Sequence, residues 1–307
     1  MEIDDYLKSC ELCPRRCKVN RVDSVGRCRQ GKNIRIALSS LHHFEEPCIS
    51  GYSEEEGKNS GSGTIFFSGC NLNCVFCQNY EISSLNKGKE ISIEDLSSIM
   101  LKLQNEGANN INLVTAFAYV PHIIEAIKIA RTKGFNIPIV YNSSGYESID
   151  TIKLLDGYVD VYLPDMKYYF PELAKELSNC EDYFEVASSA IKEMYKQVGN
   201  IEIDDNGLIK KGVVIRHLIL PNHIFNSKKV LKWIKDTFDD KVLTSVMAQY
   251  FPTYKAIESE DVNRKINKEE YDEIVNYMDK IGLNNGFIQD YSDVDESKYV
   301  PDFNSWC

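Results

Sequence analysis

The chain of 307 residues is long enough to bury a full hydrophobic core, as one large domain with an extension or as two small domains. Its hydrophobic content of 43% and charged content of 26% are ordinary for a globular protein, and its net charge of −11 argues against a protein that grips nucleic acid through phosphates. No segment approaches the ~20 apolar residues of a membrane span, and no basic segment followed by an apolar one begins the chain. We therefore expect a cytoplasmic protein with no membrane or nucleic-acid partner.

Three zones follow one another along the chain. Residues 1–50 are a Cys-rich N-terminal extension, residues 60–290 are a core domain, and residues 291–307 are a C-terminal tail. The polar, glycine-rich stretch at 50–63 predicts a loop or hinge between the first two zones. Because the cytosol keeps thiols reduced, the ten Cys residues are interpreted as metal ligands and a few spare thiols, without disulfides.

From residue 64 onward, short apolar runs alternate with amphipathic runs, which is typical of β–α units around a parallel sheet. The predicted strands are 64–68, 111–115, 137–141, 158–163, 213–220 and 242–247. Helices are predicted near 92–107, 121–134, 147–155, twice within 170–199, 227–238 and 267–281. Ser92 and Asp95 predict a helix cap, and Asn206-Gly207 predicts a hairpin between 201–204 and 208–211. This order predicts an α/β fold, a partial (β/α)6 TIM-type barrel that is open on one side.

Three cysteines, Cys70, Cys74 and Cys77, follow the first predicted strand. Three thiolates so close together can bind three corners of a four-iron, four-sulfur cube and leave one iron without a protein ligand. An open coordination position is typical of a reactive metal site. A zinc knuckle would need a fourth ligand nearby, and a ferredoxin-like electron carrier normally continues to a fourth Cys, whereas the next one here is Cys180.

All six predicted strands end in polar or charged residues, at the rim where parallel β/α barrels gather their reacting groups. A helix N-cap at residues 142–144 or a simple ion pair between Asp165 and Lys167 would explain single cases equally well. Six such ends together predict a functional rim.

The C-x3-C-x2-C pattern after an apolar strand resembles the signature of the radical S-adenosylmethionine (radical SAM) enzymes. This resemblance implies a 4Fe–4S cluster on Cys70, Cys74 and Cys77, whose open iron binds the amino and carboxylate groups of S-adenosylmethionine. It also implies reductive cleavage of S-adenosylmethionine to a 5′-deoxyadenosyl radical, which abstracts hydrogen from a substrate.

Such a cofactor needs partners for its ammonium group, its ribose hydroxyls and its adenine. Asn112 and Thr115 are expected on the ammonium side, and Asn142 with Ser144 at the ribose. Phe76 suits the adenine or the cluster, although ordinary core packing explains it equally well. The remaining expected contacts at the strand ends are Asp165, Lys167, Arg216 and Gln249.

Longer strings resemble one subgroup, the PflX-like proteins related to pyruvate formate-lyase activating enzymes. They include residues 13–17, 45–51, 61–67, 141–147, 162–168, 216–221 and 247–250. The resemblance implies an anaerobic activase that takes hydrogen from a glycine of a glycyl radical enzyme, with a reductant such as flavodoxin or ferredoxin. Modification of a small metabolite or peptide is the alternative, because the short activases lack the N-terminal Cys set. A non-catalytic iron–sulfur electron-transfer protein is the alternative of another class.

The N-terminal extension holds a second Cys set, Cys10, Cys13, Cys17 and Cys28. Four ligands are enough for a closed zinc site or for a second iron–sulfur cluster, and the spacing favours neither. The neighbouring basic residues are interpreted as charge compensation for these thiolates; they are Arg15, Arg16, Lys18, Arg27 and Arg29.

Three further cysteines, Cys48, Cys180 and Cys307, are interpreted as spare thiols. His42 and Cys48 flank Glu45 and Glu46, and this group is expected to lie in a solvated loop, with a substrate-side cluster as the alternative.

Overall fold

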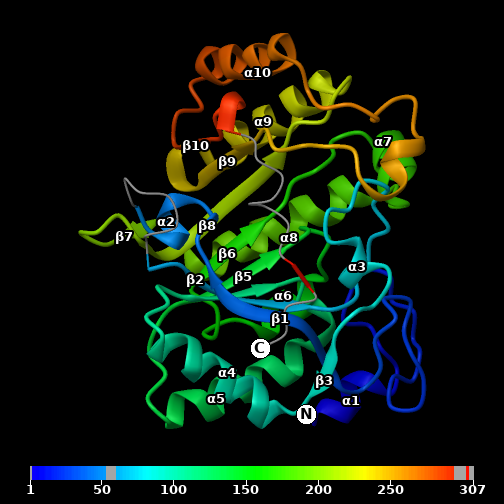
Figure 1. The fold of residues 1–307 in the computed structure, drawn as a ribbon, viewed down its shortest axis with the longest axis vertical. Coiled ribbons are helices and arrows are strands. Elements are labelled where there is room, and N and C mark those ends of the chain that lie inside the picture. Colours follow the sequence, from blue (N-terminus) through cyan, green and yellow to red (C-terminus); the bar gives the residue numbers. More distant parts are fainter. Residues whose placement is uncertain (1, 53–59, 294–301, 304–307) are drawn as a thin grey trace.

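The computed structural model describes residues 2–52, 60–293 and 302–303. Its strands form one sheet in the order β10-β9-β8-β6-β5-β4-β2-β1-β3, with β7 paired to β8. From β10 to β2 all neighbours run parallel, whereas β1 pairs antiparallel with β2 and with β3. Among the described strands, β10 and β3 end the sheet without pairing to each other, so the sheet is a partial, open barrel (Figure 1).

The six predicted parallel strands are confirmed with small shifts of their ends. They are β2 (Ser62–Phe67), β4 (Ile111–Val114), β5 (Ile139–Ser143), β6 (Val161–Pro164), β8 (Ile209–Leu218) and β9 (Leu243–Met247). The predicted hairpin is also confirmed, since β7 (Glu202–Ile203) pairs antiparallel with β8. Three strands were not predicted, namely β1 (Ile34–His42), β3 (Lys89–Ile91) and β10 (Gly286–Ile288). Two of these have only three residues, too few to show an alternating pattern.

The predicted helices are confirmed as α4 (Ile93–Asn105), α5 (Val120–Thr132), α6 (Ile149–Leu154), α7 (Pro171–Ser178), α8 (Tyr183–Val198), α9 (Ile224–Phe238) and α10 (Lys268–Ile281). The predicted cap of α4 forms, because the hydroxyl of Ser92 accepts a hydrogen bond from the backbone N–H of Asp95 at 3.0 Å. Three short helices, α1 (Ile3–Leu7), α2 (Pro47–Ser50) and α3 (Tyr80–Ser83), were not predicted. Helices α4 and α5 lie at one end of the molecule and α9 and α10 at the other (Figure 1).

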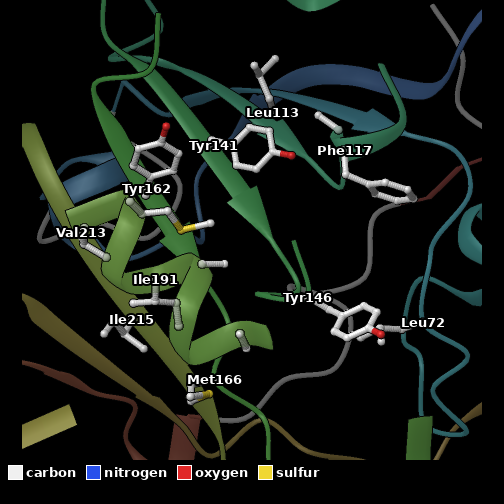
Figure 2. Close-up of a cluster of buried hydrophobic side chains, with 14 of the residues drawn as sticks. Leu72, Leu113, Phe117, Tyr141, Tyr146, Tyr162, Met166, Ile191, Val213 and Ile215 are labelled. Carbon is white, nitrogen blue, oxygen red and sulfur yellow. The ribbon is translucent and has the colours of Figure 1, made fainter. Parts of the chain in front are cut away.

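The main core lies between the sheet and its surrounding helices. Tyr141 of β5 and Tyr162 of β6 are fully buried, with ring centroids 6.1 Å apart in an edge-to-face contact (Figure 2). Leu72 and Tyr146, which follow β2 and β5, also belong to this core. The loop that carries the three cysteines is therefore packed as part of the interior. Within the described part of the chain, no helix has the length and apolar character to cross a bilayer.

The predicted hinge at 50–63 and the predicted tail at 291–307 are only partly covered. Residues 53–59 of the hinge, and residues 294–301 and 304–307 of the tail, lie outside the described residues. Cys307, one of the predicted spare thiols, lies there too.

Candidate functional site

A cavity of ≈ 470 Å³ opens at the carboxyl ends of the parallel strands. This is the rim where parallel β/α barrels place their reacting groups. The cavity wall includes nearly all of the residues proposed for the cluster and for S-adenosylmethionine, namely Cys70, Cys74, Phe76, Cys77, Thr115, Asn142, Ser144, Asp165, Lys167, Arg216 and Gln249. Residues far apart in the sequence are thus brought to one hollow because consecutive parallel strands end at the same edge.

Each of the three loop sulfurs has a hydrogen-bonding neighbour. The backbone N–H of Leu72 donates to Sγ of Cys70 at 3.4 Å, and the hydroxyl of Ser178 donates to Sγ of Cys74 at 2.9 Å. Sγ of Cys77 lies 3.1 Å from Oγ of Ser83. Groups that donate to sulfur stabilise a thiolate, which is the form that binds iron.

Burial makes the free thiolates costly at this site. It raises the pKa of Cys77 to about 11, helped by the neighbouring Cys74, and it also raises the pKa values of Cys70 and Cys74. A bound cation offsets that cost, because metal binding displaces the protons of its thiol ligands. The donor set therefore fits a metal centre.

The arrangement of the cysteines also bears on the kind of centre. Among the described residues, no three His, Cys, Asp or Glu side chains are grouped as ligands of one metal ion. Thiolates that bind different corners of an iron–sulfur cube need not converge on one point. Three thiols of one loop in the cavity wall match in number the three corner ligands of such a cube.

Gly69 lets the N-terminal segment approach the cysteine loop. Its φ of +84° is unfavourable for other residues, and a Cβ atom there would lie 2.6 Å from the carbonyl oxygen of Cys28. On the other side of the loop, Nε of Arg15 donates to the carbonyl of Asn71 at 3.0 Å. The N-terminal extension is therefore packed directly against the loop that presents Cys70.

Two charged side chains follow β6 in the cavity wall. Nζ of Lys167 lies 2.5 Å from Oδ2 of Asp165. Burial opposes the positive charge of Lys167, but the nearby Asp165 and Cys74 outweigh it and raise the pKa of the amine. Lys167 is therefore a cation beside the sulfurs.

Neutral polar groups line the cavity at β4, β5 and β9. Thr115 has a left-handed φ of +59°, and its N–H donates to the carbonyl of Asn142 at 2.9 Å. Ser144 lies two residues further along the rim, and its carbonyl accepts from Tyr183 at 2.7 Å. The amide oxygen of Gln249 accepts from Gln289 at 3.2 Å. These groups offer donors and acceptors at three sides of one hollow.

Two proposed contacts have a different setting. Asn112 lies within β4, not at its end, and it does not line the cavity; its Nδ2 donates to Oε1 of Glu45 at 2.9 Å. The sequence interpretation expected Asn112 beside the ammonium group of S-adenosylmethionine. The structure instead places Asn112 inside the strand, which continues past it to Val114. Phe76 lines the cavity and also packs edge-to-face on Tyr250, with ring centroids 5.7 Å apart.

The prediction that Glu45 and Glu46 lie in a solvated loop is wrong. Glu46 is buried and the side chain of Glu45 is only 9% exposed. Both carboxylates line the cavity and share the guanidinium of Arg216, whose Nε lies 2.7 Å from Oε1 of Glu46. The cationic Arg216 outweighs the effect of burial and lowers the pKa of Glu46. His42 also lines the cavity, and burial lowers its pKa, so its ring is neutral at neutral pH. The weak sequence signal was the apolar pair Cys48-Ile49 after Pro47, which α2 buries.

The N-terminal Cys set lies outside this cavity, and within the described residues its sulfurs are not grouped as ligands of one metal ion. Cys10, Cys13 and Cys28 are buried, and burial together with the neighbouring Cys28 and Cys10 raises the pKa of Cys13 to about 12. Nη1 of Arg21 donates to Sγ of Cys10 at 3.7 Å. Arg21 was not among the basic residues predicted to compensate these thiolates, and of the predicted ones Arg16 and Lys18 pair instead with the carboxylates of Asp150 and Glu11.

Comparison with known proteins identifies the family. The model of the Radical SAM superfamily matches residues 64–234, more than half of the chain. An uncharacterized protein of Methanocaldococcus jannaschii is 33% identical over 287 residues, which cover 91% of this chain and 77% of that protein.

Solved structures share the fold. The Streptococcus suis protein SuiB bound to its precursor peptide SuiA matches 72% of this chain and 46% of its own, with 12% identity and a TM-score of 0.50. The FeFe-hydrogenase maturase HydG of Carboxydothermus hydrogenoformans matches 71% of this chain and 50% of its own, with 17% identity and a TM-score of 0.50. This chain thus spans about half the length of these structures. It belongs to the Radical SAM superfamily, whose members are enzymes that use a 4Fe–4S cluster and S-adenosylmethionine.

Proposed function

We propose that this protein cleaves S-adenosylmethionine reductively at a cluster held by Cys70, Cys74 and Cys77, and that it abstracts hydrogen from a bound substrate. The observation that carries the proposal is the position of the three sulfurs in the wall of the strand-end cavity. When bound, the cluster and S-adenosylmethionine supply the electron and the 5′-deoxyadenosyl radical.

The chain's own residues bind and orient S-adenosylmethionine and shield the reacting groups from water. Thr115, Asn142 and Ser144 are assigned to the polar groups of S-adenosylmethionine, because they line the cavity on the strands next to β2. Lys167 holds positive charge near the sulfurs, and Phe76 excludes water from the same region.

The far wall of the cavity is assigned to the hydrogen donor. It contains Glu45, Glu46 and Arg216 together with Met247 from β9 and Phe287 from the edge strand β10. A glycine in a peptide segment of a glycyl radical enzyme is the proposed donor, and a small metabolite or another peptide is the second candidate. SuiB, which shares the fold, was solved with a precursor peptide.

The N-terminal extension is proposed to carry a second metal on Cys10, Cys13, Cys17 and Cys28. Besides burial, the neighbouring Cys10 raises the pKa values of both Cys13 and Cys28, and this closeness supports one shared centre. Zinc and a second cluster are separated by metal analysis and Mössbauer spectra of anaerobically purified protein. Two iron–sulfur clusters per chain would mean that the N-terminal set holds a second cluster. One cluster and one zinc ion per chain would mean that it holds zinc.

The catalytic proposal is tested by anaerobic reconstitution with iron and sulfide. Addition of dithionite and S-adenosylmethionine should yield 5′-deoxyadenosine and methionine. No product from protein that carries the cluster would favour the non-catalytic electron-transfer alternative. With a candidate donor deuterated at one position, deuterium in the 5′-deoxyadenosine identifies the donor.

A further inference from the structure

We propose that an acidic one-electron carrier protein docks on a small surface formed by Val25, Arg27, Arg29 and Leu85. The proposal rests on the proposed function, because reductive cleavage consumes an electron at the cysteine loop. The carrier gives up one electron and is oxidised. That electron is consumed when the carbon–sulfur bond of S-adenosylmethionine breaks, leaving methionine and the 5′-deoxyadenosyl radical. We name the four residues the carrier surface.

The carrier surface belongs to a basic segment of an acidic protein. Between residues 15 and 35 the chain has eight Lys or Arg residues and one Asp, whereas its net charge is −11. A local positive region steers an acidic partner to one place, while the remaining acidic surface repels it elsewhere. The charge distribution therefore favours docking at this segment.

Apart from the buried Arg21, the cations of this segment that form no ion pair within the described residues are Arg15, which donates to the carbonyls of Asn71 and Asn179, and the neighbouring Arg27 and Arg29. Arg27 is exposed and forms no ion pair within the described residues. Arg29 donates to the carbonyl of Ser83 at 3.1 Å and has no carboxylate partner in the described part of the chain. Four other cations of the segment form ion pairs with carboxylates, namely Arg16, Lys18, Lys32 and Arg35. Arg21 is buried in the interior.

The same surface lies close to a cluster cysteine. Ser83 accepts the hydrogen bond of Arg29 with its carbonyl, and its hydroxyl lies 3.1 Å from Sγ of Cys77. One residue thus contacts both the surface arginine and the sulfur. Asn86 donates to the carbonyl of Arg29 at 3.3 Å and fixes the turn that holds Leu85. An electron that arrives at this surface enters the loop through a few bonds and contacts.

The composition of the surface favours a protein over a nucleic acid. Val25 and Leu85 expose 61% and 64% of their surface, which gives two apolar contacts beside two cations. Brief electron-transfer encounters use small interfaces at the low end of the size range. Single-stranded nucleic acid instead depends on aromatic side chains that stack on bases, and none of the four residues is aromatic.

The test compares two electron sources in one assay. The reconstituted protein is supplied with dithionite or with a reduced, acidic plant-type 2Fe–2S ferredoxin, and 5′-deoxyadenosine is measured. For the R27E/R29E variant we expect kcat/KM for ferredoxin to fall by about tenfold or more, with the dithionite rate unchanged. R27E alone and R27Q/R29Q should lose less. Rising ionic strength should slow the wild type with ferredoxin and have little effect on R27E/R29E.

A matched control makes the same charge change far from the loop. K232E/K241E alters exposed lysines on α9 and on the turn after it, and it should keep the wild-type kcat/KM for ferredoxin. Circular dichroism melting verifies that all variants fold.

Equal kcat/KM for ferredoxin in the wild type and R27E/R29E would overturn the proposal. A wild type that accepts electrons from dithionite but not from ferredoxin would overturn it as well. If R27E/R29E keeps the wild-type kcat/KM for ferredoxin but loses binding of an RNA 20-mer, the carrier surface is assigned to nucleic acid. No product with dithionite contradicts the catalytic proposal instead.

Discussion

Nε of Arg216 lies 2.7 Å from Oε1 of Glu46, and this buried contact joins β8 to the segment between β1 and α2. Glu45 binds the same guanidinium, so one cation serves two carboxylates in the cavity wall. Buried charges are tolerated only when paired. The three side chains therefore stabilise one another and hold the N-terminal segment over the rim of the sheet.

Replacement of Arg216 by Met should strongly destabilise the protein. R216M leaves two carboxylates buried without their cation, so we expect a loss of about 3–5 kcal/mol in the free energy of unfolding. Urea denaturation of the metal-free protein measures it. The control K232M breaks the exposed pair of Lys232 with Asp236 and should leave the free energy of unfolding nearly unchanged. A similar small loss for R216M would show that the carboxylates need no cation.

Replacement of any one of the loop cysteines by Ala should abolish formation of 5′-deoxyadenosine. C70A, C74A and C77A each remove one corner ligand, so bound iron and the cluster absorption should fall as well. C180A is the matched control, because Cys180 is buried but does not line the cavity. Formation of 5′-deoxyadenosine that persists in all three loop variants would contradict the assignment of these cysteines as cluster ligands.

Loss of the Ser178 hydroxyl should change the cluster without removing a ligand. Its hydrogen bond to Cys74 stabilises negative charge on sulfur, and reduction adds negative charge to a cluster. S178A should therefore shift the midpoint potential to a more negative value and lower the turnover rate by about tenfold. A redox titration followed by electron paramagnetic resonance measures the shift. S188A, whose hydroxyl bonds a carbonyl within α8, should leave the potential unchanged.

Glu147 should make stability fall as pH rises. Burial raises its pKa to about 8 from 4.5, although hydrogen bonds from Tyr141 and Ser143 oppose the shift. Between these two pH values the folded protein keeps a proton that the unfolded chain releases. The free energy of unfolding should then decrease with a slope of about 1.4 kcal/mol per pH unit from this group.

The variant E147Q isolates that contribution. Its neutral amide has no proton to lose, so the difference in unfolding free energy between E147Q and the wild type should grow from pH 5 to pH 8 in favour of E147Q. Urea denaturation at pH 5, 6.5 and 8 checks this. A difference that stays constant over the range would show that Glu147 is ionised throughout.

Much of the fold was predictable because local patterns agree with the tertiary structure. Strands such as β4 and β6 are buried on both faces and therefore appear as continuous apolar runs, and α4 shows a helical period and a capping pair. Strand β10 could not be predicted from its three residues, because it exists through pairing with β9. Strand β1 pairs with β2 antiparallel, and no local pattern specifies that partner.

Part of the cavity was predictable for the same reason. Parallel strands end at one edge, so the positions of Thr115, Asn142 and Asp165 follow from the strand order. Glu45 and Glu46 were assigned to solvent because an acidic pair is usually exposed. Their cation, Arg216, is about 170 residues away, and only the folded chain brings these charges together.

The sequence by itself determined the spacing of the three cysteines and the succession of parallel strands and helices after them, because residue spacing and hydrophobic periodicity are local properties. Only the tertiary structure decided which charges are buried and which are exposed. It placed Arg216 in the cavity wall and left Arg27 exposed on the surface. The physical reason is that desolvation of a charge depends on distant segments that exclude water, and an arginine has the same side chain in both places.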